Sequence, residues 1–415
     1  MQGTPDGARH LSGDFLLGAG LVLGALALAG ALFLRLRQSV IPAFILLGVL
    51  VRPDRFDEHM VEALATIGVV LLLFYMGLEF SLRALLENRR QILRTGAIDL
   101  VALPVGILAG LLLGHGISGA LLFGGAFYVT SSAIVAKSII ELRRAADPET
   151  EVGLGILVFE DLAIALYLAV LSGAVLVAEP SLSAAGGGIL KAILFFGLGL
   201  LIAVRARPLL YKLLDVGSVD LFVLLAGALV LLLSWLALRA GLSEAIGAFL
   251  AGLVVAETRH RERADRLFAP LQGLFAAVFF FAFGLSIDPR TFGQVWLPAL
   301  LLALLAAAVK VGVGWFAGRR SGLGPRASLS LGLILVPRGE FSIIIAGLAL
   351  AAGMAEMASL LAMFVLILSL LGTATLQYAP QISRWAFPRK PVRSLEAEGF
   401  RPDLAAFPEP DRRAS

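Results

Sequence analysis

The chain has 415 residues, of which 59% are hydrophobic and 15% are charged, and its mean hydropathy is +0.92. A soluble globular chain is roughly 45–50% apolar and about 25% charged, so this composition excludes a soluble enzyme, a nucleic-acid-binding protein and a disordered scaffold. The net charge of +4 does not indicate a nucleic-acid partner, because the basic residues fall in short loops between apolar runs. The absence of cysteine and the small number of histidines, four, argue against a thiolate or histidine-rich metal site. No cofactor is expected.

Thirteen apolar runs are candidates for membrane-spanning helices, each of which needs about 20 mostly apolar residues. The sequence therefore predicts an all-α polytopic membrane protein. The first run begins after polar residues and many others follow it, so it is interpreted as a span and not as a cleaved signal peptide. The second and ninth runs are short and are expected to be tilted or partly re-entrant. The runs cover residues 13–34, 39–51, 61–81, 92–114, 117–140, 152–178, 187–205, 218–238, 242–257, 267–287, 295–317, 326–352 and 356–378.

Lysine and arginine residues gather in alternate loops, and this asymmetry orients the chain in the membrane. The basic loops hold Arg35, Arg37, Arg83, Arg89, Arg90, Arg94, Arg143, Arg144, Arg205, Arg207, Lys212, Arg259, Arg261, Arg263, Arg266, Arg319, Arg320 and Arg326. The opposite loops hold few: Arg52, Arg55, Lys191, Arg239 and Arg290. The pattern predicts a multi-pass protein of the cell (inner) membrane, with the N-terminus outside and the C-terminus in the cytoplasm. That orientation requires an odd number of spans, which thirteen satisfies.

The third and tenth runs contain a weak internal repeat. Phe74, Gly77, Leu78 and Arg83 recur as Phe281, Gly284, Leu285 and Arg290, at one constant offset of 207 positions. The two segments lie seven helices apart, so they cross the membrane in opposite directions. An inverted-topology repeat of this kind is typical of transporters.

The repeat divides the chain into two halves. We expect one transmembrane exchanger domain over residues 1–379, with the first repeat at about 13–178, a linker helix at 187–205 and the second repeat at about 218–378. Residues 380–415 are rich in Pro, Arg and Glu and contain no Gly-x-Gly-x-x-Gly motif. This cytoplasmic tail is expected to be disordered.

Two helices at corresponding positions of the halves carry interruptions. The fifth run holds Thr130, Ser131 and Ser132, and the twelfth holds Val336-Pro337-Arg338-Gly339-Glu340. Proline removes a helical hydrogen bond, and glycine relaxes the backbone. Paired interruptions in the two halves are the best sequence pointer to a transporter's binding site. The alternative for the hydroxyl residues is that they only pack helices closely.

Three charged residues, Glu160, Asp161 and Lys310, fall deep inside apolar runs, where a charge costs at least about 2.5–3.5 kcal/mol on insertion scales. Glu160 and Asp161 are adjacent in the sixth run, and their side chains point about 100° apart on a helix, so both can line one cavity wall. Lys310 lies in the middle of the eleventh run, and Glu160 is its natural partner. The alternatives are purely structural ion pairs for the two acids and snorkelling for the lysine.

The remaining charges near the interruptions have simpler interpretations. Arg338 and Glu340 flank the break in the twelfth run, where fixed charges would compensate the partial charges of half-helix ends. Glu79 lies near the cytoplasmic end of its helix and is either interfacial or part of the charge compensation. Asp99, Asp220 and Glu244 are expected to be structural or solvated.

These segments together resemble the monovalent cation:proton antiporter-2 family, which includes Kef-type potassium/proton antiporters and Nap-type sodium/proton exchangers. The matching residues are Gly77-Leu78-Glu79-Phe80, Thr130-Ser131-Ser132-Ala133-Ile134, Phe159-Glu160-Asp161-Leu162, Lys310 and Arg338-Gly339-Glu340-Phe341-Ser342. The resemblance implies a sodium/proton antiporter-like fold of 13 helices, with two broken, crossing helices, and a homodimer formed through a panel domain. It also implies an ion-binding carboxylate at Asp161 and a lysine at Lys310 that pairs with the first acid. Glu160 departs from the family, where Asp or Gln is usual, and this leaves the stoichiometry open.

The leading hypothesis is a secondary antiporter that exchanges K⁺ or Na⁺ for H⁺ by alternating access, with Asp161 as the shared cation and proton site. Thr130, Ser131 and carbonyls freed by the helix break are expected to help bind the ion. A sodium-coupled organic anion symporter of similar fold is a second hypothesis, against which the Glu160-Asp161 pair and Lys310 argue. A channel or sensory membrane module is a third, because fold alone does not prove function. The expected partners are membrane lipid, a second copy of the chain and a separate cytoplasmic regulatory subunit.

Overall fold

The computed structural model describes residues 5–51, 58–79, 88–175 and 212–388, together with isolated positions between 190 and 205. Within these ranges the regular secondary structure is entirely helical, as the composition predicts. Seven of the described helices are long and apolar enough to cross a membrane, and four shorter apolar helices accompany them. The chain is therefore a multi-pass membrane protein.

The helices of the first half follow the predicted runs, with two interruptions. They are α1 (Pro5–Arg35), α2 (Ile41–Leu50), α3 (Glu58–Glu79), α5 (Arg89–Asp99), α6 (Ala102–Leu112), α7 (Gly116–Tyr128), α8 (Ser132–Glu141) and α9 (Pro148–Val175). The fifth predicted run is divided into α7 and α8, as expected. The fourth is also divided, into α5 and α6, which the sequence analysis did not predict. Pro104 explains this turn, because its ring excludes the normal helical position of the carbonyl four residues earlier.

The second half has the same order of helices, except that its counterpart of α5 and α6 is one continuous helix, α15. Its helices are α12 (Val219–Arg239), α13 (Glu244–Ala256), α14 (Arg261–Leu285), the short 3₁₀ helix η2 (Pro289–Thr291), α15 (Phe292–Arg320), α16 (Pro325–Ile334), α17 (Glu340–Ala351) and α18 (Ala355–Ala386). The twelfth predicted run is divided into α16 and α17. Helix α18 continues through Pro380 to Ala386 and so enters the segment that was assigned to the tail. The predicted linker helix at 187–205 and the tail from residue 389 lie outside the continuously described residues.

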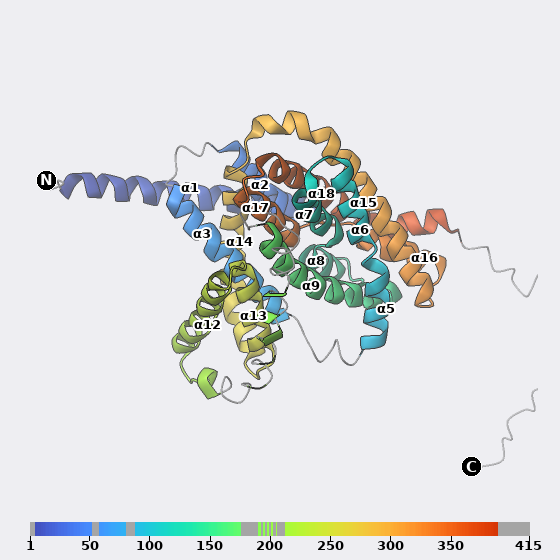
Figure 1. Ribbon diagram of the computed structural model, residues 1–415, viewed down its shortest axis with the longest axis horizontal. Helices are drawn as coiled ribbons and strands as arrows, with labels where there is room; N and C mark the ends of the chain where they lie inside the picture. The colour runs from blue at the N-terminus through green and yellow to red at the C-terminus, as the bar shows by residue number, and fades with distance from the viewer. Residues whose placement is uncertain are drawn as a thin grey trace, which may run out of the picture.

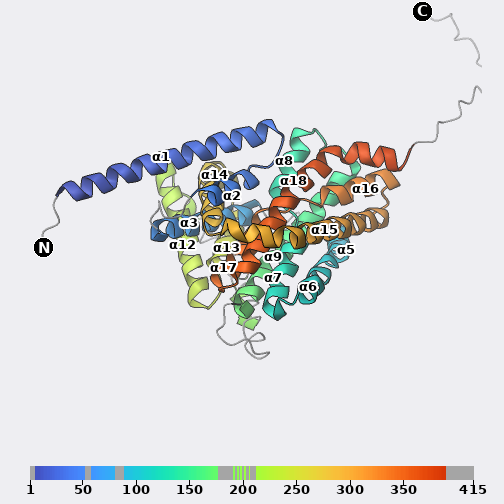
Figure 2. The same cartoon turned by 90° about the horizontal axis from the view of Figure 1, so that it is seen from above.

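The described helices form two groups that lie side by side (Figure 1). In the first group, which we call the panel group, α3 packs against α13 and α14, α2 against α14 and α1, and α12 against α13. The second, the core group, contains α5 to α9 and α15 to α18, with α6 on α7, α5 on α9, and α15 on both α16 and α18. Figure 2 shows the same two groups from above, with α1 extending away from the others.

Close glycine contacts in the panel group have the relation that an inverted repeat predicts. Gly77 of α3 lies against Gly252 of α13, and Gly284 of α14 lies against Gly48 of α2. A Cβ at any of these positions would collide with the backbone of the partner helix. Gly77 and Gly284 are the two glycines that the 207-residue offset relates. Each therefore lets its helix approach a short neighbour, α13 in one half and α2 in the other.

Candidate ion-exchange site

The two broken helices of the core group meet at their interruptions. The backbone is unwound between Tyr128 and Ser132 in one helix and between Ile334 and Glu340 in the other. The N–H of Ser131 donates to the Pro337 carbonyl at 2.9 Å, so the two unwound segments are in direct contact. This confirms the predicted pair of broken, crossing helices.

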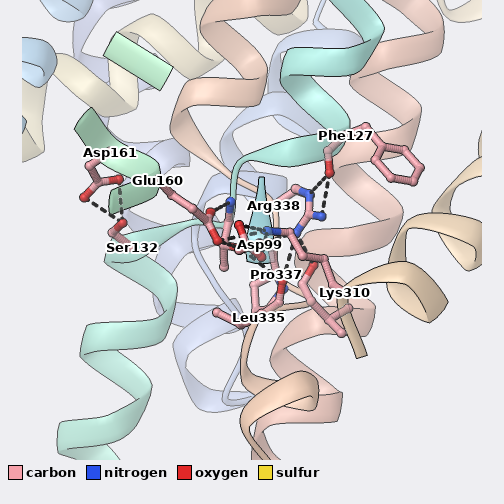
Figure 3. Close-up of polar contacts among 11 residues, drawn as sticks. Asp99, Phe127, Ser132, Glu160, Asp161, Lys310, Leu335, Pro337 and Arg338 are labelled. Carbon is pink, nitrogen blue, oxygen red and sulfur yellow. Dashed lines mark hydrogen bonds and ion pairs between the residues drawn. The ribbon is translucent and has the colours of Figure 1, made fainter. Parts of the chain in front are cut away.

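Arg338 compensates the carboxyl ends of two half-helices. Its side chain is fully buried, and its guanidinium donates to the Phe127 carbonyl at 2.7 and 3.2 Å, near the end of α7. It also donates to the carbonyls of Leu335, Val336 and Pro337 at 2.9–3.3 Å, directly after α16. These carbonyls carry the partial negative charge of a helix C-terminus and have no intrahelical donor. One arginine thus donates hydrogen bonds to carbonyls at both helix breaks (Figure 3).

Glu340 compensates the amino ends of the other two half-helices, α17 and α8. It is the first residue of α17, is 2% exposed, and accepts a hydrogen bond from the Ser131 hydroxyl at 2.7 Å. The N–H of Ala133, in the first turn of α8, points at the same carboxylate at 3.5 Å. Helix N-termini carry partial positive charge, so Glu340 lies where α17 begins and faces the beginning of α8.

A cluster of three charged residues lies next to the point where the broken helices cross. Lys310 of α15, Asp99 of α5 and Glu160 of α9 are all 0% exposed. The Lys310 ammonium is 2.7 and 2.8 Å from the two Asp99 oxygens and 2.9 Å from Glu160 Oε1. The backbone N–H and the hydroxyl of Thr130 also bond Glu160, which ties the cluster to the unwound segment after α7. Lys310 is thus paired with the predicted Glu160 and with a second acid.

Asp161 lies apart from this cluster. Asp161 is half-buried, and its carboxylate accepts from the Ser132 hydroxyl at 2.8 and 2.9 Å. Figure 3 shows the two adjacent acids leaving α9 in different directions, Asp161 toward Ser132 and Glu160 toward Lys310. Glu160 is therefore fully buried and paired with a lysine, whereas Asp161 is half-buried and has one hydroxyl partner.

The structure also places Asp99 and Glu79, for which the sequence left two interpretations each. Asp99, expected to be structural or solvated, is fully buried against Lys310, so its solvated alternative is wrong. Its occurrence inside an apolar run was the available signal, but which acid contacts which lysine depends on how distant helices pack. Glu79 is exposed at the end of α3, where its carbonyl accepts from Arg261 at 2.7 Å.

Crossed half-helices with buried compensating charges, beside a half-buried aspartate, define a class of secondary ion transporter. The profile described as "Sodium/hydrogen exchanger, transmembrane" matches residues 22–379. The chain therefore belongs to the transmembrane sodium/hydrogen exchanger family, and the resemblance stated from the sequence is confirmed. It is a cation/proton antiporter of the sodium/proton antiporter-like fold.

Two relatives and one solved structure show which members of this family the chain is similar to. The K⁺/H⁺ antiporter subunit KhtU of Bacillus subtilis (strain 168) is 39% identical over 389 residues, which cover 89% of this chain and 94% of that protein. The ammonium/H⁺ antiporter subunit AmhT of Alkalihalophilus pseudofirmus is 34% identical over 396 residues, which cover 92% and 97%. The structure of the sodium proton antiporter MjNhaP1 from Methanocaldococcus jannaschii superposes with a TM-score of 0.65 at 17% identity, covering 89% of this chain and 98% of that one.

Proposed function

We propose that this chain exchanges K⁺, or another monovalent cation, for H⁺ by alternating access, with the Asp161 carboxylate as the shared site. The observation that carries the proposal is the position of Asp161, half-buried beside the crossing and bonded to Ser132. A carboxylate can hold a cation or a proton but not both, which makes the exchange obligatory. The name of the relative KhtU, a K⁺/H⁺ antiporter subunit, supports K⁺ as the first cation to test.

The hydroxyl residues of the unwound segment take different roles in this proposal. Ser132 bonds Asp161 and is the side chain best placed to share the ion. Thr130 bonds Glu160, and Ser131 bonds Glu340, so we assign these two residues the positioning of the acids rather than direct ion binding. Glu160, Lys310, Arg338 and Glu340 supply the fixed charges around the site, and Glu79 lies at the exposed end of α3.

The assembly is also a proposal. We assign the panel group, α1 to α3 and α12 to α14, to a homodimer interface, as the family resemblance implies. The relatives KhtU and AmhT are each named as a subunit, which supports a separate cytoplasmic regulatory partner for this chain. The arginine-rich loops support an inner-membrane location with the C-terminus in the cytoplasm. The exchanger domain is assigned to residues 1–379.

Proteoliposomes that contain the purified chain and a trapped pH dye test this function. Addition of K⁺, Na⁺, Li⁺ or Rb⁺ in turn should drive proton movement across the vesicle membrane, with K⁺ effective, and addition of choline should not. Cation flux without proton movement would favour a channel. Na⁺ uptake that requires an organic anion and moves no protons would favour the sodium-coupled symporter. Either result would contradict the proposal.

A further inference from the structure

The contacts of Lys310 are unequal. Both Asp99 oxygens accept from its ammonium, at 2.7 and 2.8 Å, whereas Glu160 contributes one oxygen at 2.9 Å. Asp99 is the last residue of α5 and lies where the chain continues through Leu100 and Val101, both in helical conformation, into α6. Lys310 therefore stabilises a carboxylate that is buried in the middle of a span.

The two acids also differ in their other partners. Glu160 receives hydrogen bonds from the N–H and the hydroxyl of Thr130, which remain if the lysine moves. Lys310 donates to both Asp99 oxygens, and the Glu160 side chain also lies within hydrogen-bonding reach of Asp99. Lys310 is therefore the cation that both acids share, but only Glu160 has the additional donors of Thr130.

Within the described part of the chain, the ion pairs of Lys310 are those with Asp99 and Glu160. The Tyr128 ring lies 5.0 Å from Lys310 Nζ, and the buried Arg338 guanidinium bonds carbonyls at the helix breaks. Asp161, the half-buried acid, is bonded to Ser132.

We propose that Asp99 is the resident counter-ion of Lys310 and keeps the lysine charged throughout the transport cycle. This inference rests on the proposed exchange at Asp161. With Asp99 in place, a change at Glu160 leaves Lys310 paired, so the lysine releases no second proton when the cation binds. One cation then exchanges for one proton at Asp161, and no net charge crosses the membrane.

The alternative is a lysine whose pairing with Glu160 alone is broken by the cation, so that it gives up a second proton in each cycle. That exchange would be electrogenic. For two protons per cation, a membrane potential of about 60 mV shifts the balancing cation gradient about tenfold. For one proton per cation the shift is zero. The two cases are therefore distinguished by a single balance measurement.

The experiment uses the full chain in proteoliposomes at a fixed pH difference, with K⁺ gradients in a choline background. The K⁺ ratio at which the trapped pH dye shows no net proton flux is measured without a potential, and again with one imposed by a thiocyanate gradient. We expect the same balancing ratio in both conditions. A tenfold shift would overturn the inference while leaving cation/proton exchange established. Absence of any K⁺-driven flux would instead overturn the proposed function.

Variants test the role of Asp99 itself. In Asp99→Asn, Lys310 keeps only Glu160, so the balancing ratio should become dependent on potential, and Asp99→Glu should restore its independence. Asp220→Asn, an exposed acid on α12, is the matched control and should behave like the parent chain. An Asp99→Asn protein that transports with an unshifted ratio would overturn the inference.

A second variant decides the matter if Asp99→Asn does not fold. The double variant Asp99→Asn/Lys310→Gln removes both charges, and Glu160 keeps its hydrogen bonds from Thr130, so it should fold and retain measurable exchange whose balancing ratio does not respond to potential. If the folded double variant transports no protons, Lys310 is a proton carrier and the inference is wrong.

Discussion

Arg338 and Glu340 show how two side chains can stabilise four half-helix ends inside a membrane protein. The arginine bonds the carboxyl ends of α7 and α16, and the glutamate lies at the amino ends of α17 and α8. Water cannot satisfy these backbone groups in the hydrocarbon region, so interior side chains must do so. The crossing is therefore maintained by fixed charges that are separate from the exchanging carboxylate.

Replacing Arg338 by Gln should destabilise the protein by at least about 1–3 kcal/mol, because several buried carbonyls lose their donor. Arg338→Lys should recover only part of this loss, since a compact ammonium does not reproduce the forked geometry of a guanidinium. The exposed Arg290→Gln is a suitable control. Thermal unfolding in detergent measures the effect, and an Arg338→Gln protein as stable as the control would contradict this account of the breaks.

The important residues of the core were only partly predictable from the sequence. Glu160, Asp161 and Lys310 were identified because charges in apolar runs are expensive. The pairing of Lys310 with Asp99 was missed, since these residues are distant in the chain and meet only when α5 packs beside α15. The engagement of Thr130 with Glu160 likewise depends on the exact course of the unwound segment.

At the scale of the elements, close helix approach depends on glycines at the contacts. Gly284 of α14 lies against the backbone of α2, around Ile45 and Gly48. Small residues at helix contacts allow backbones to approach closely, which favours van der Waals packing within the membrane. The contact of Gly77 with α13 repeats this arrangement in the other half.

A pair of substitutions in α14 tests this packing. Gly284→Ala should lower the unfolding temperature markedly, because the new methyl group would meet backbone atoms of α2 that cannot rotate away. Gly273→Ala, in the same helix, meets nothing within 4 Å and should be neutral or slightly stabilising, since alanine favours helix more than glycine does. Equal unfolding temperatures for the two variants would contradict the packing argument.

The helix breaks were predictable where residues within the break itself disfavour a helix. Pro337 and Gly339 indicated the interruption between α16 and α17, and consecutive hydroxyl residues indicated the one between α7 and α8. The turn between α5 and α6 was missed, although Pro104 offered a signal. The extension of α18 past Pro380 was not predicted because proline is tolerated in a helix whose neighbours satisfy the freed backbone groups.

At the scale of the whole molecule, the panel and core groups meet near the site, where α13 contacts α9 and α18 contacts α2. Alternating access in transporters with inverted repeats is largely a rigid-body movement of one bundle against another. Movement of the core group would carry Asp161 from one side to the other while Lys310, Asp99 and the crossing move with it. The apolar runs of the described helices and the repeat could be identified from the sequence, whereas the grouping of helices required the three-dimensional contacts.

The orientation of the chain can be measured at the two ends of α15. The sequence contains no cysteine, so a single introduced cysteine is an unambiguous label site. Gln294→Cys, at the exposed start of α15, should react in intact cells with a membrane-impermeant maleimide. Ser321→Cys, directly after this helix, should react only after the cells are opened. The reverse pattern would contradict the assignment of the C-terminus to the cytoplasm.

The central claim, that Asp161 is the shared cation and proton site, is tested most directly by Asp161→Asn in proteoliposomes with a trapped pH dye. An amide cannot alternate between a proton and a cation, so K⁺-driven proton movement should fall to the level of protein-free vesicles. The variant should keep the folded elution profile and unfolding temperature of the Asp220→Asn control. Substantial K⁺-driven proton movement by a folded Asp161→Asn protein would contradict the account.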